Sequence, residues 1–326
     1  MHCRISAFRA GVKNHSIRVG ENAKFSYGEK GVKVLGQPTI LFVHGLSSNK
    51  ETFLPIIKDI PDIYHVVTVD LPGHGSTVGL NEDFYTCNKF ADSLKKFIDA
   101  LGLVDRKNPN ICLIGASMGG SVVLMFSTKY PEYVKMVMLL APPADESSET
   151  DLIRTIRAGD YDTLLPQTCE QFHNMVRLLT IKRINLPRPF LNGFLKLRRR
   201  HLDEHRKEYD YPQFETYHQQ LRSVECPVFI IWGREDKLFT YTGAEYFRNL
   251  IPNSEIRIVD ECGHFMAIDQ PELLAQIITA FYQKHFKTVP PLSSRRPFTA
   301  TAPVVKKFDI PRRSLCNDDE AEGYYF

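Results

Sequence analysis

Long apolar runs are absent from this 326-residue chain. No stretch of about 18 consecutive apolar residues occurs, so we expect no transmembrane segment. The opening sequence MHCRISAFRAGVKNHSIRVG also lacks the apolar centre of a signal peptide. We therefore expect the protein on the cytoplasmic side of the membrane, with peripheral membrane contact at most.

Paired cysteines and a strong net charge are also lacking. The seven cysteines are odd in number and scattered, and no C-x-x-C pair occurs, which argues against a disulfide framework and a zinc site. A formal net charge of +3 is small for this length and disfavours a nucleic-acid-binding protein. With 43% hydrophobic residues the chain can bury a sizeable core. We expect no metal, no organic cofactor and no obligate protein partner.

Apolar runs that alternate with helical patterns predict the fold class. Six runs are typical of buried parallel strands: 39–43, 65–69, 111–114, 136–140, 228–232 and 256–259. Between strands, apolar residues recur at three- and four-residue spacing over 90–101, as in a helix that covers a sheet, and again over 273–281. This alternation predicts an α/β protein with a doubly wound, mostly parallel sheet, preceded by a short antiparallel pair at 16–19 and 24–27.

Two segments interrupt this alternation and divide the chain. Residues 144–222 show amphipathic helical pieces broken by prolines and no buried-strand pattern; they predict a helical lid inserted before the seventh strand. From residue 289 the chain is rich in Pro, Ser and Arg with little periodicity, which is typical of a disordered tail. We thus expect a core in two parts, 1–143 and 223–288, a lid at 144–222 and a tail at 289–326.

A G-x-S-x-G pattern is the sharpest signal of chemistry. The sequence Gly115-Ala116-Ser117-Met118-Gly119 lies between an apolar strand and a helical run. In that context, small residues on both sides let the chain turn sharply and lift a serine hydroxyl above the sheet, in a nucleophile elbow. Serine by itself is a weak nucleophile, so Ser117 requires a base that a third group orients. The alternative is an ordinary helix N-cap serine after a glycine turn.

An acid and a histidine follow later strands, in the chain order that such an architecture uses. Asp236, in WGRED, lies just past 228–232, and His264, in ECGHF, lies just past 256–259. Because the carboxyl ends of parallel strands meet at one edge, we expect His264 to be the base and Asp236 its orienting acid. Asp145, after the preceding strand, is a rival acid, and a purely structural role is the alternative for His264.

Two backbone amides are candidates for an oxyanion hole. The negative charge that develops in acyl transfer needs preorganised N–H donors. The candidates are the N–H of Met118, directly after the serine, and the N–H of Leu46, which follows His44 by two positions. We expect His44 to hold that loop rather than to act as a base. His74, between two glycines, is interpreted first as part of a tight loop near the site.

These motifs together resemble the α/β-hydrolase fold enzymes, over roughly residues 24–287. The phrases that carry the resemblance are His44-Gly45, Asp70 to Gly75, Gly115 to Gly120, Trp232 to Asp236 and Cys262 to His264. The resemblance implies the α/β-hydrolase fold and a serine hydrolase, with Ser117, Asp236 and His264 matching the triad of that family.

A narrower resemblance concerns the substrate. Residues 53–58, 230–233 and 261–264 are similar to the membrane-associated monoacylglycerol lipases of the α/β-hydrolase-domain-containing 6 type. This resemblance implies that the substrate is a lipid ester, namely an acylglycerol that is split into fatty acid and glycerol.

The expected lid is both basic and apolar. Residues 177–207 hold ten Lys and Arg against two acidic residues, a local balance of +8, interleaved with Leu, Ile and Phe. Such a segment suits the surface of an anionic bilayer, where each nearby cation adds about 1 kcal/mol. An ordinary cap that packs its apolar face on the core is the alternative.

We predict a carboxylic ester hydrolase of the acylglycerol lipase type that works through an acyl-enzyme. A lysophospholipase, a hydrolase of small soluble carboxylesters or carbon–carbon bonds, and a non-catalytic binding module of the same fold stay open as alternatives. An epoxide hydrolase or dehalogenase is disfavoured, because those reactions use an aspartate at the elbow, where Ser117 stands.

Overall fold

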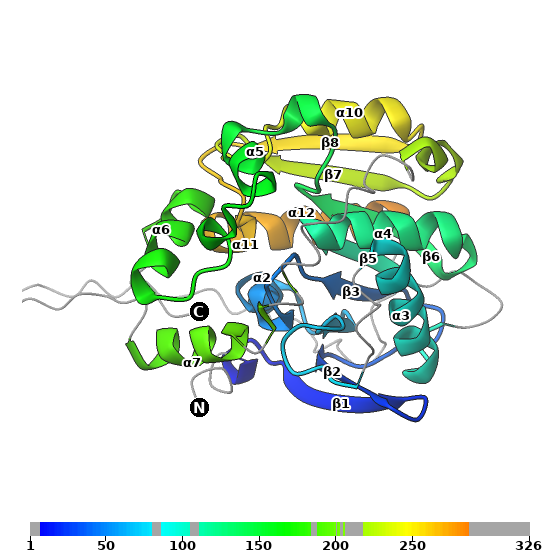
Figure 1. Cartoon of the computed structure of the whole chain (residues 1–326). Coiled ribbons are helices and arrows are strands. Elements are labelled where there is room, and N and C mark those ends of the chain that lie inside the picture. Colours follow the sequence, from blue (N-terminus) through cyan, green and yellow to red (C-terminus); the bar gives the residue numbers. More distant parts are fainter. Residues whose placement is uncertain are drawn as a thin grey trace, which may run out of the picture.

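One eight-stranded sheet organises the residues that the computed structural model describes, which are 7–79, 86–104, 111–183, 188–199, 201–202, 205 and 218–286. Its strands are β1 (Lys13–Val19), β2 (Ala23–Lys30), β3 (Thr39–Val43), β4 (Val66–Val69), β5 (Ile111–Ala116), β6 (Val134–Leu140), β7 (Val228–Gly233) and β8 (Ser254–Val259). They lie in the order β1-β2-β4-β3-β5-β6-β7-β8 (Figure 1). The tail expected at 289–326 lies outside the described residues.

The strand directions confirm the predicted fold class. β1 pairs antiparallel with β2, and β2 pairs antiparallel with β4, whereas all pairs from β4 to β8 are parallel. The expected antiparallel lead-in is therefore present, but β1 begins at Lys13, three residues before the expected start at 16. The pattern does not show this start, because β1 is an edge strand with mostly exposed side chains.

Strand composition follows from how each strand is covered. Every residue of β3 is buried, and β6 is almost as completely buried, because helices cover both faces of a parallel sheet. β8 lies at the edge and alternates between half-buried and exposed residues up to Val259, which is buried; the expectation that the whole run 256–259 is buried is therefore wrong. Continuous apolar runs therefore identify the central strands, and alternation marks the edge.

Helices cover both faces of the sheet (Figure 1). They are η1 (Lys50–Phe53), α2 (Leu54–Asp59), α3 (Cys87–Ala100), α4 (Met118–Lys129), η2 (Pro131–Tyr133), α10 (Thr242–Leu250), α11 (Met266–Asp269) and α12 (Pro271–His285). Right-handed crossovers place the helix after β3 on one face and those after β4 and β5 on the other, because the strand order reverses between them. Accordingly α2 packs on α12, and α3 packs on α4.

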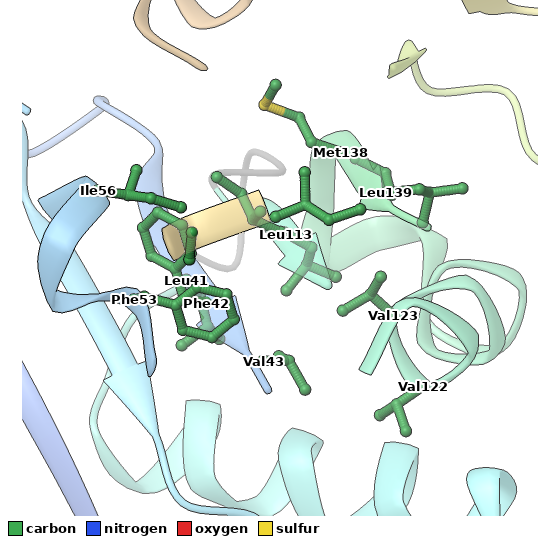
Figure 2. Packing of buried hydrophobic residues seen from close by; sticks show 14 of the residues in the cluster. Leu41, Phe42, Val43, Phe53, Ile56, Leu113, Val122, Val123, Met138 and Leu139 are labelled. Carbon is green, nitrogen blue, oxygen red and sulfur yellow. The ribbon is translucent and has the colours of Figure 1, made fainter. Parts of the chain in front are cut away.

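The hydrophobic core fills the space between the central strands and these helices. Figure 2 shows residues of β3, β5 and β6 between side chains of α2 and α4. Phe42 and Phe53 lie with ring centroids 4.8 Å apart, and Leu113 and Val123 are fully buried. Because this core lies among the central strands, it holds their carboxyl ends rigidly in place.

Between β6 and β7 the described chain is helical and forms the insertion that the sequence predicts at 144–222. Its elements are η3 (Glu146–Ser148), α5 (Asp151–Arg157), η4 (Tyr161–Thr163), α6 (Cys169–Leu179), α7 (Arg188–Arg199) and η5 (Gln219–Ser223). α6 packs on α7, where the rings of Phe172 and Phe194 lie 5.0 Å apart. The division of the chain at these boundaries stays a prediction. Within the described residues, no helix is both long and apolar enough to span a bilayer.

Candidate active site

Ser117 occupies a strained turn between β5 and α4. Its backbone has φ 52° and ψ −126°, a region that residues other than glycine rarely adopt. The Ser117 N–H donates to the carbonyl of Leu140 at 2.8 Å, and its own carbonyl accepts from Gly120 N at 2.7 Å. Such strain persists where the surrounding structure fixes the chain on both sides, and it is typical of functional sites.

The two glycines of the elbow are explained by close backbone contacts. A Cβ at Gly115 would lie 2.3 Å from the carbonyl oxygen of Gly119. A Cβ at Gly119 would lie 2.3 Å from the carbonyl oxygen of Val43 and 2.5 Å from that of His44. Only hydrogen fits at these positions, so the G-x-S-x-G pattern is a packing requirement of the turn.

His264 and Asp236 form a buried hydrogen-bonded pair. His264 Nδ1 lies 2.7 Å from Asp236 Oδ2, and the two side chains are 3% and 0% exposed. Asp236 Oδ1 accepts from the N–H groups of Leu238 at 2.8 Å and Phe239 at 3.1 Å. An ionised carboxylate only accepts, so Nδ1 of His264 carries the proton and Nε2 is left as the basic nitrogen.

Ser117, Asp236 and His264 all follow strands of one parallel set. The ends of β5, β6, β7 and β8 are neighbours, with Ala116 paired to Leu140 in β5–β6 and Gly233 paired to Val259 in β7–β8. The structure therefore brings the three residues to the same edge of the sheet. Asp145 does not bind the histidine; its carboxylate accepts from Ser147 Oγ at 2.5 Å. The catalytic roles themselves remain a proposal.

The loop after β3 presents the Gly45–Leu46 peptide to the elbow. A Cβ at Gly45 would lie 3.6 Å from Ser117 Oγ. His44 Nε2 accepts from Leu71 N at 3.0 Å, so its Nδ1 donates to the Gly45 carbonyl at 2.8 Å. Burial lowers the pKa of His44, which keeps the ring neutral. The Gly45–Leu46 peptide is trans, so its carbonyl and its N–H point in opposite directions. Because the carbonyl points toward His44, the N–H of Leu46 points away from His44.

Met118, the second expected donor, is the first residue of α4. The first N–H groups of a helix have no acceptor within the helix, and the helix dipole makes this end favourable for negative charge. Both expected oxyanion donors thus come from backbone that flanks Ser117, and their role stays a proposal.

His74 supports the same loop, as its position between two glycines suggests. Its Nε2 accepts from Ser47 N at 3.1 Å, and its Nδ1 donates to the Pro72 carbonyl at 3.0 Å. Burial, together with the neighbouring ring of His205, holds the pKa of His74 well below its usual range. The side chain therefore acts as a neutral hydrogen-bonding support.

Three further residues, none of them predicted as site residues, support these loops. Asp269, at the end of α11, accepts from the N–H groups of Gly263 and of residues 181 and 182. Glu235 Oε2 accepts from Cys262 N at 2.9 Å, and Arg198 of the insertion reaches the carbonyl of Ser47. These contacts join segments far apart in the chain, and no local pattern marks them. Among the described residues, no group of three or more His, Cys, Asp and Glu is arranged to hold a metal ion.

A serine at a strand-to-helix elbow, with a hydrogen-bonded His–Asp pair at the same edge of the parallel sheet, is the arrangement of α/β serine hydrolases. The chain belongs to the alpha/beta hydrolase fold family, whose model matches residues 38–271. The fold and the family resemblance predicted from the sequence are thereby confirmed.

Individual relatives carry lipase and esterase names. The chain is 28% identical to monoacylglycerol lipase ABHD6 of Homo sapiens over 272 residues, which is 80% of each chain. It is 28% identical to monoacylglycerol lipase abhd6-B of Xenopus laevis over 80% of this chain and 79% of that one. Among solved structures, a membrane phospholipase A matches with a TM-score of 0.78 and 23% identity, over 86% of this chain and 89% of that chain. Together with the family, these matches indicate an ester hydrolase.

Proposed function

We propose that this protein hydrolyses monoacylglycerols to a fatty acid and glycerol. The observation that carries the proposal is the buried pair of His264 and Asp236, 2.7 Å apart, at the sheet edge that also carries the Ser117 elbow. The similarity to monoacylglycerol lipases over 80% of the chain supports the choice of substrate.

The first half of the reaction forms an acyl-enzyme. His264 Nε2 takes the hydroxyl proton of Ser117 while Oγ attacks the carbonyl carbon of the ester. The oxygen that becomes negative accepts from the N–H groups of Leu46 and Met118. When the intermediate collapses, the bond to the glycerol oxygen breaks, and His264 returns the proton to that oxygen. Glycerol leaves.

The second half regenerates the enzyme. Water gives a proton to His264 Nε2 and attacks the acyl carbonyl carbon, the bond to Ser117 Oγ breaks, and Oγ recovers the proton. Asp236 accepts hydrogen bonds from two backbone N–H groups and from the imidazole. It orients His264 and stabilises the transient imidazolium. One ester and one water give one acid and one alcohol.

The helical insertion, in this proposal, acts as a lid that contacts anionic membrane. Among the apolar side chains of α6 and α7 that the structure describes, Leu179, Leu191 and Leu195 are buried, so the contact rests mainly on charge. Exposed cations within 177–207 supply it: Arg177, Lys182, Arg183 and Lys196. Ile181, 44% exposed, adds apolar area. Location on the cytoplasmic side and a lipid ester substrate belong to the same proposal.

The test compares a long-chain and a short-chain ester. Fatty acid release from emulsified monoacylglycerol is measured beside cleavage of a water-soluble short-chain ester, with wild type and Ser117→Ala. Ser121→Ala is the matched control, because Ser121 is buried in the next turn of α4 outside the proposed site. The proposal requires long-chain release that Ser117→Ala abolishes and Ser121→Ala retains.

Other outcomes identify other functions. Cleavage of the short ester alone would assign a hydrolase of small soluble esters. Folded protein that neither turns over substrate nor labels at Ser117 with a fluorophosphonate would be a binding module of the same fold. Faster release of fatty acid from lysophospholipid vesicles than from monoacylglycerol would assign a lysophospholipase that works by the same chemistry.

A further inference from the structure

Arg198 connects the helical insertion to the loop that carries one proposed oxyanion donor. The residue lies on α7 and is only 6% exposed. Its Nη2 donates to the carbonyl of Ser47 at 2.8 Å, across 151 residues of sequence. Its guanidinium also lies 4.8 Å from the ring centroid of Phe194 and 3.4 Å, through Nη1, from Met175 Sδ. The contacts within the insertion orient the guanidinium toward the loop.

Ser47 is held from two sides. Its φ of 54° is in the left-handed region, where a residue other than glycine needs support. The N–H of Ser47 donates to His74 Nε2 at 3.1 Å, on the core side, and its carbonyl accepts from Arg198, on the insertion side. The backbone directly after Leu46 is therefore fixed by one core residue and one residue of the insertion.

Buried aromatic contacts strengthen this connection. The ring of His205, also from the insertion, lies 4.6 Å from that of His74, which lies 4.8 Å from that of His44. His44 in turn donates to the carbonyl of the Gly45–Leu46 peptide. The residues before and after Leu46 are thus each hydrogen-bonded to a core histidine, Gly45 to His44 and Ser47 to His74. The insertion packs against His74 through His205.

We propose that Arg198 is a positioning residue for the oxyanion hole: by binding the Ser47 carbonyl, it holds the Leu46 N–H in place when the insertion is docked. This inference rests on the proposed serine hydrolase function. Docking of the insertion then changes the rate of the chemical step as well as access to the site. A donor amide that shifts by a fraction of an ångström loses much of its effect, because an oxyanion hole stabilises charge only at a fixed geometry.

The experiment uses Arg198→Met in the full chain and a soluble short-chain ester, so that lipid binding does not enter. Loss of one oxyanion donor lowers kcat by about 100- to 1000-fold, and a displaced donor should cost part of that. We expect kcat to fall about 10- to 100-fold, with KM changed less than about threefold. Arg154→Met is the matched control, because Arg154 lies on α5 of the same insertion with its side chain 58% exposed, paired to Asp151.

A second readout separates positioning from a general structural effect. A trifluoromethyl ketone forms an oxyanion with the enzyme, so its inhibition constant should rise by the same factor as kcat falls, while a ground-state alcohol inhibitor binds unchanged. Wild-type kcat and ketone affinity in folded Arg198→Met would overturn the inference. If that variant does not fold, Arg198→Lys is tested in its place: its shorter side chain should lower both kcat and ketone affinity by at least about threefold. Wild-type kcat and ketone affinity in Arg198→Lys would then overturn the inference. Inactive wild-type protein would instead reject the proposed function.

Discussion

Replacing Asp269 by asparagine should destabilise the fold, because this carboxylate joins the base loop to the insertion. Asp269 is fully buried. Its Oδ2 accepts from Gly263 N at 2.8 Å, its Oδ1 accepts from Lys182 N at 3.0 Å, and Ile181 N lies 3.1 Å from both oxygens. Gly263 directly precedes His264, so the same carboxylate supports the proposed base.

The magnitude follows from these three donors. In asparagine one oxygen becomes an NH₂ group that faces a backbone N–H, and a buried donor left unsatisfied costs about 1–3 kcal/mol. The two remaining bonds lose their charge assistance, at about 1 kcal/mol each. The sum is about 3–5 kcal/mol, which at about 2 °C per kcal/mol lowers the melting temperature by about 6–10 °C.

The assay is thermal unfolding followed by circular dichroism, with kcat on a soluble ester measured beside it. Asp260→Asn is the matched control, since Asp260 is 72% exposed and pairs with Arg234; it should change stability by less than about 0.5 kcal/mol. We also expect Asp269→Asn to lower kcat, because the loop that holds His264 loses a support. A melting temperature within about 1 °C of wild type would refute the reasoning.

Two further predictions concern packing and pH. Gly119→Ala should destabilise the protein by more than about 3 kcal/mol or prevent folding, because its Cβ would meet two backbone carbonyl oxygens. Gly193→Ala is the control: no atom lies within 4 Å of its Cβ, so this variant should melt at or above the wild-type temperature. Equal melting temperatures of the two variants would contradict this prediction. The free energy of unfolding should also fall as the pH drops below about 6.5, by up to about 1.4 kcal/mol per pH unit for each buried histidine. In this range histidines of the unfolded chain become protonated, whereas the buried histidines of the folded protein stay neutral. The cause is burial, which lowers the pKa of His44, His74 and His205. Urea unfolding at pH 7.5 and 5.5 measures this loss, and equal free energies of unfolding would show that these histidines are protonated in the fold.

Local pattern was sufficient for the sheet and for the candidate residues at its edge. β3 spans the predicted run 39–43, and the other parallel strands lie within about two residues of theirs. The central strands are recognisable because a strand buried on both faces must be apolar throughout, whereas β8 alternates because it lies at the edge. Ser117, Asp236 and His264 could be predicted because each follows a parallel strand, and parallel strands end at a common edge. The helical character of the insertion followed from its amphipathic helical pattern and from the absence of a buried-strand pattern.

Contacts between distant segments were decided by the tertiary structure alone. Arg198 reaches Ser47 across 151 residues, and Asp269 reaches Ile181 across 88; in the sequence these are one more cation in a basic segment and one acid at the end of a short helix. The orientation of the Leu46 amide likewise depends on the tautomer of His44, which a bond from Leu71 sets. Periodicity reports which face of an element is buried. It carries no information on the partner that a single polar side chain meets, because that partner is chosen by how the insertion packs on the core.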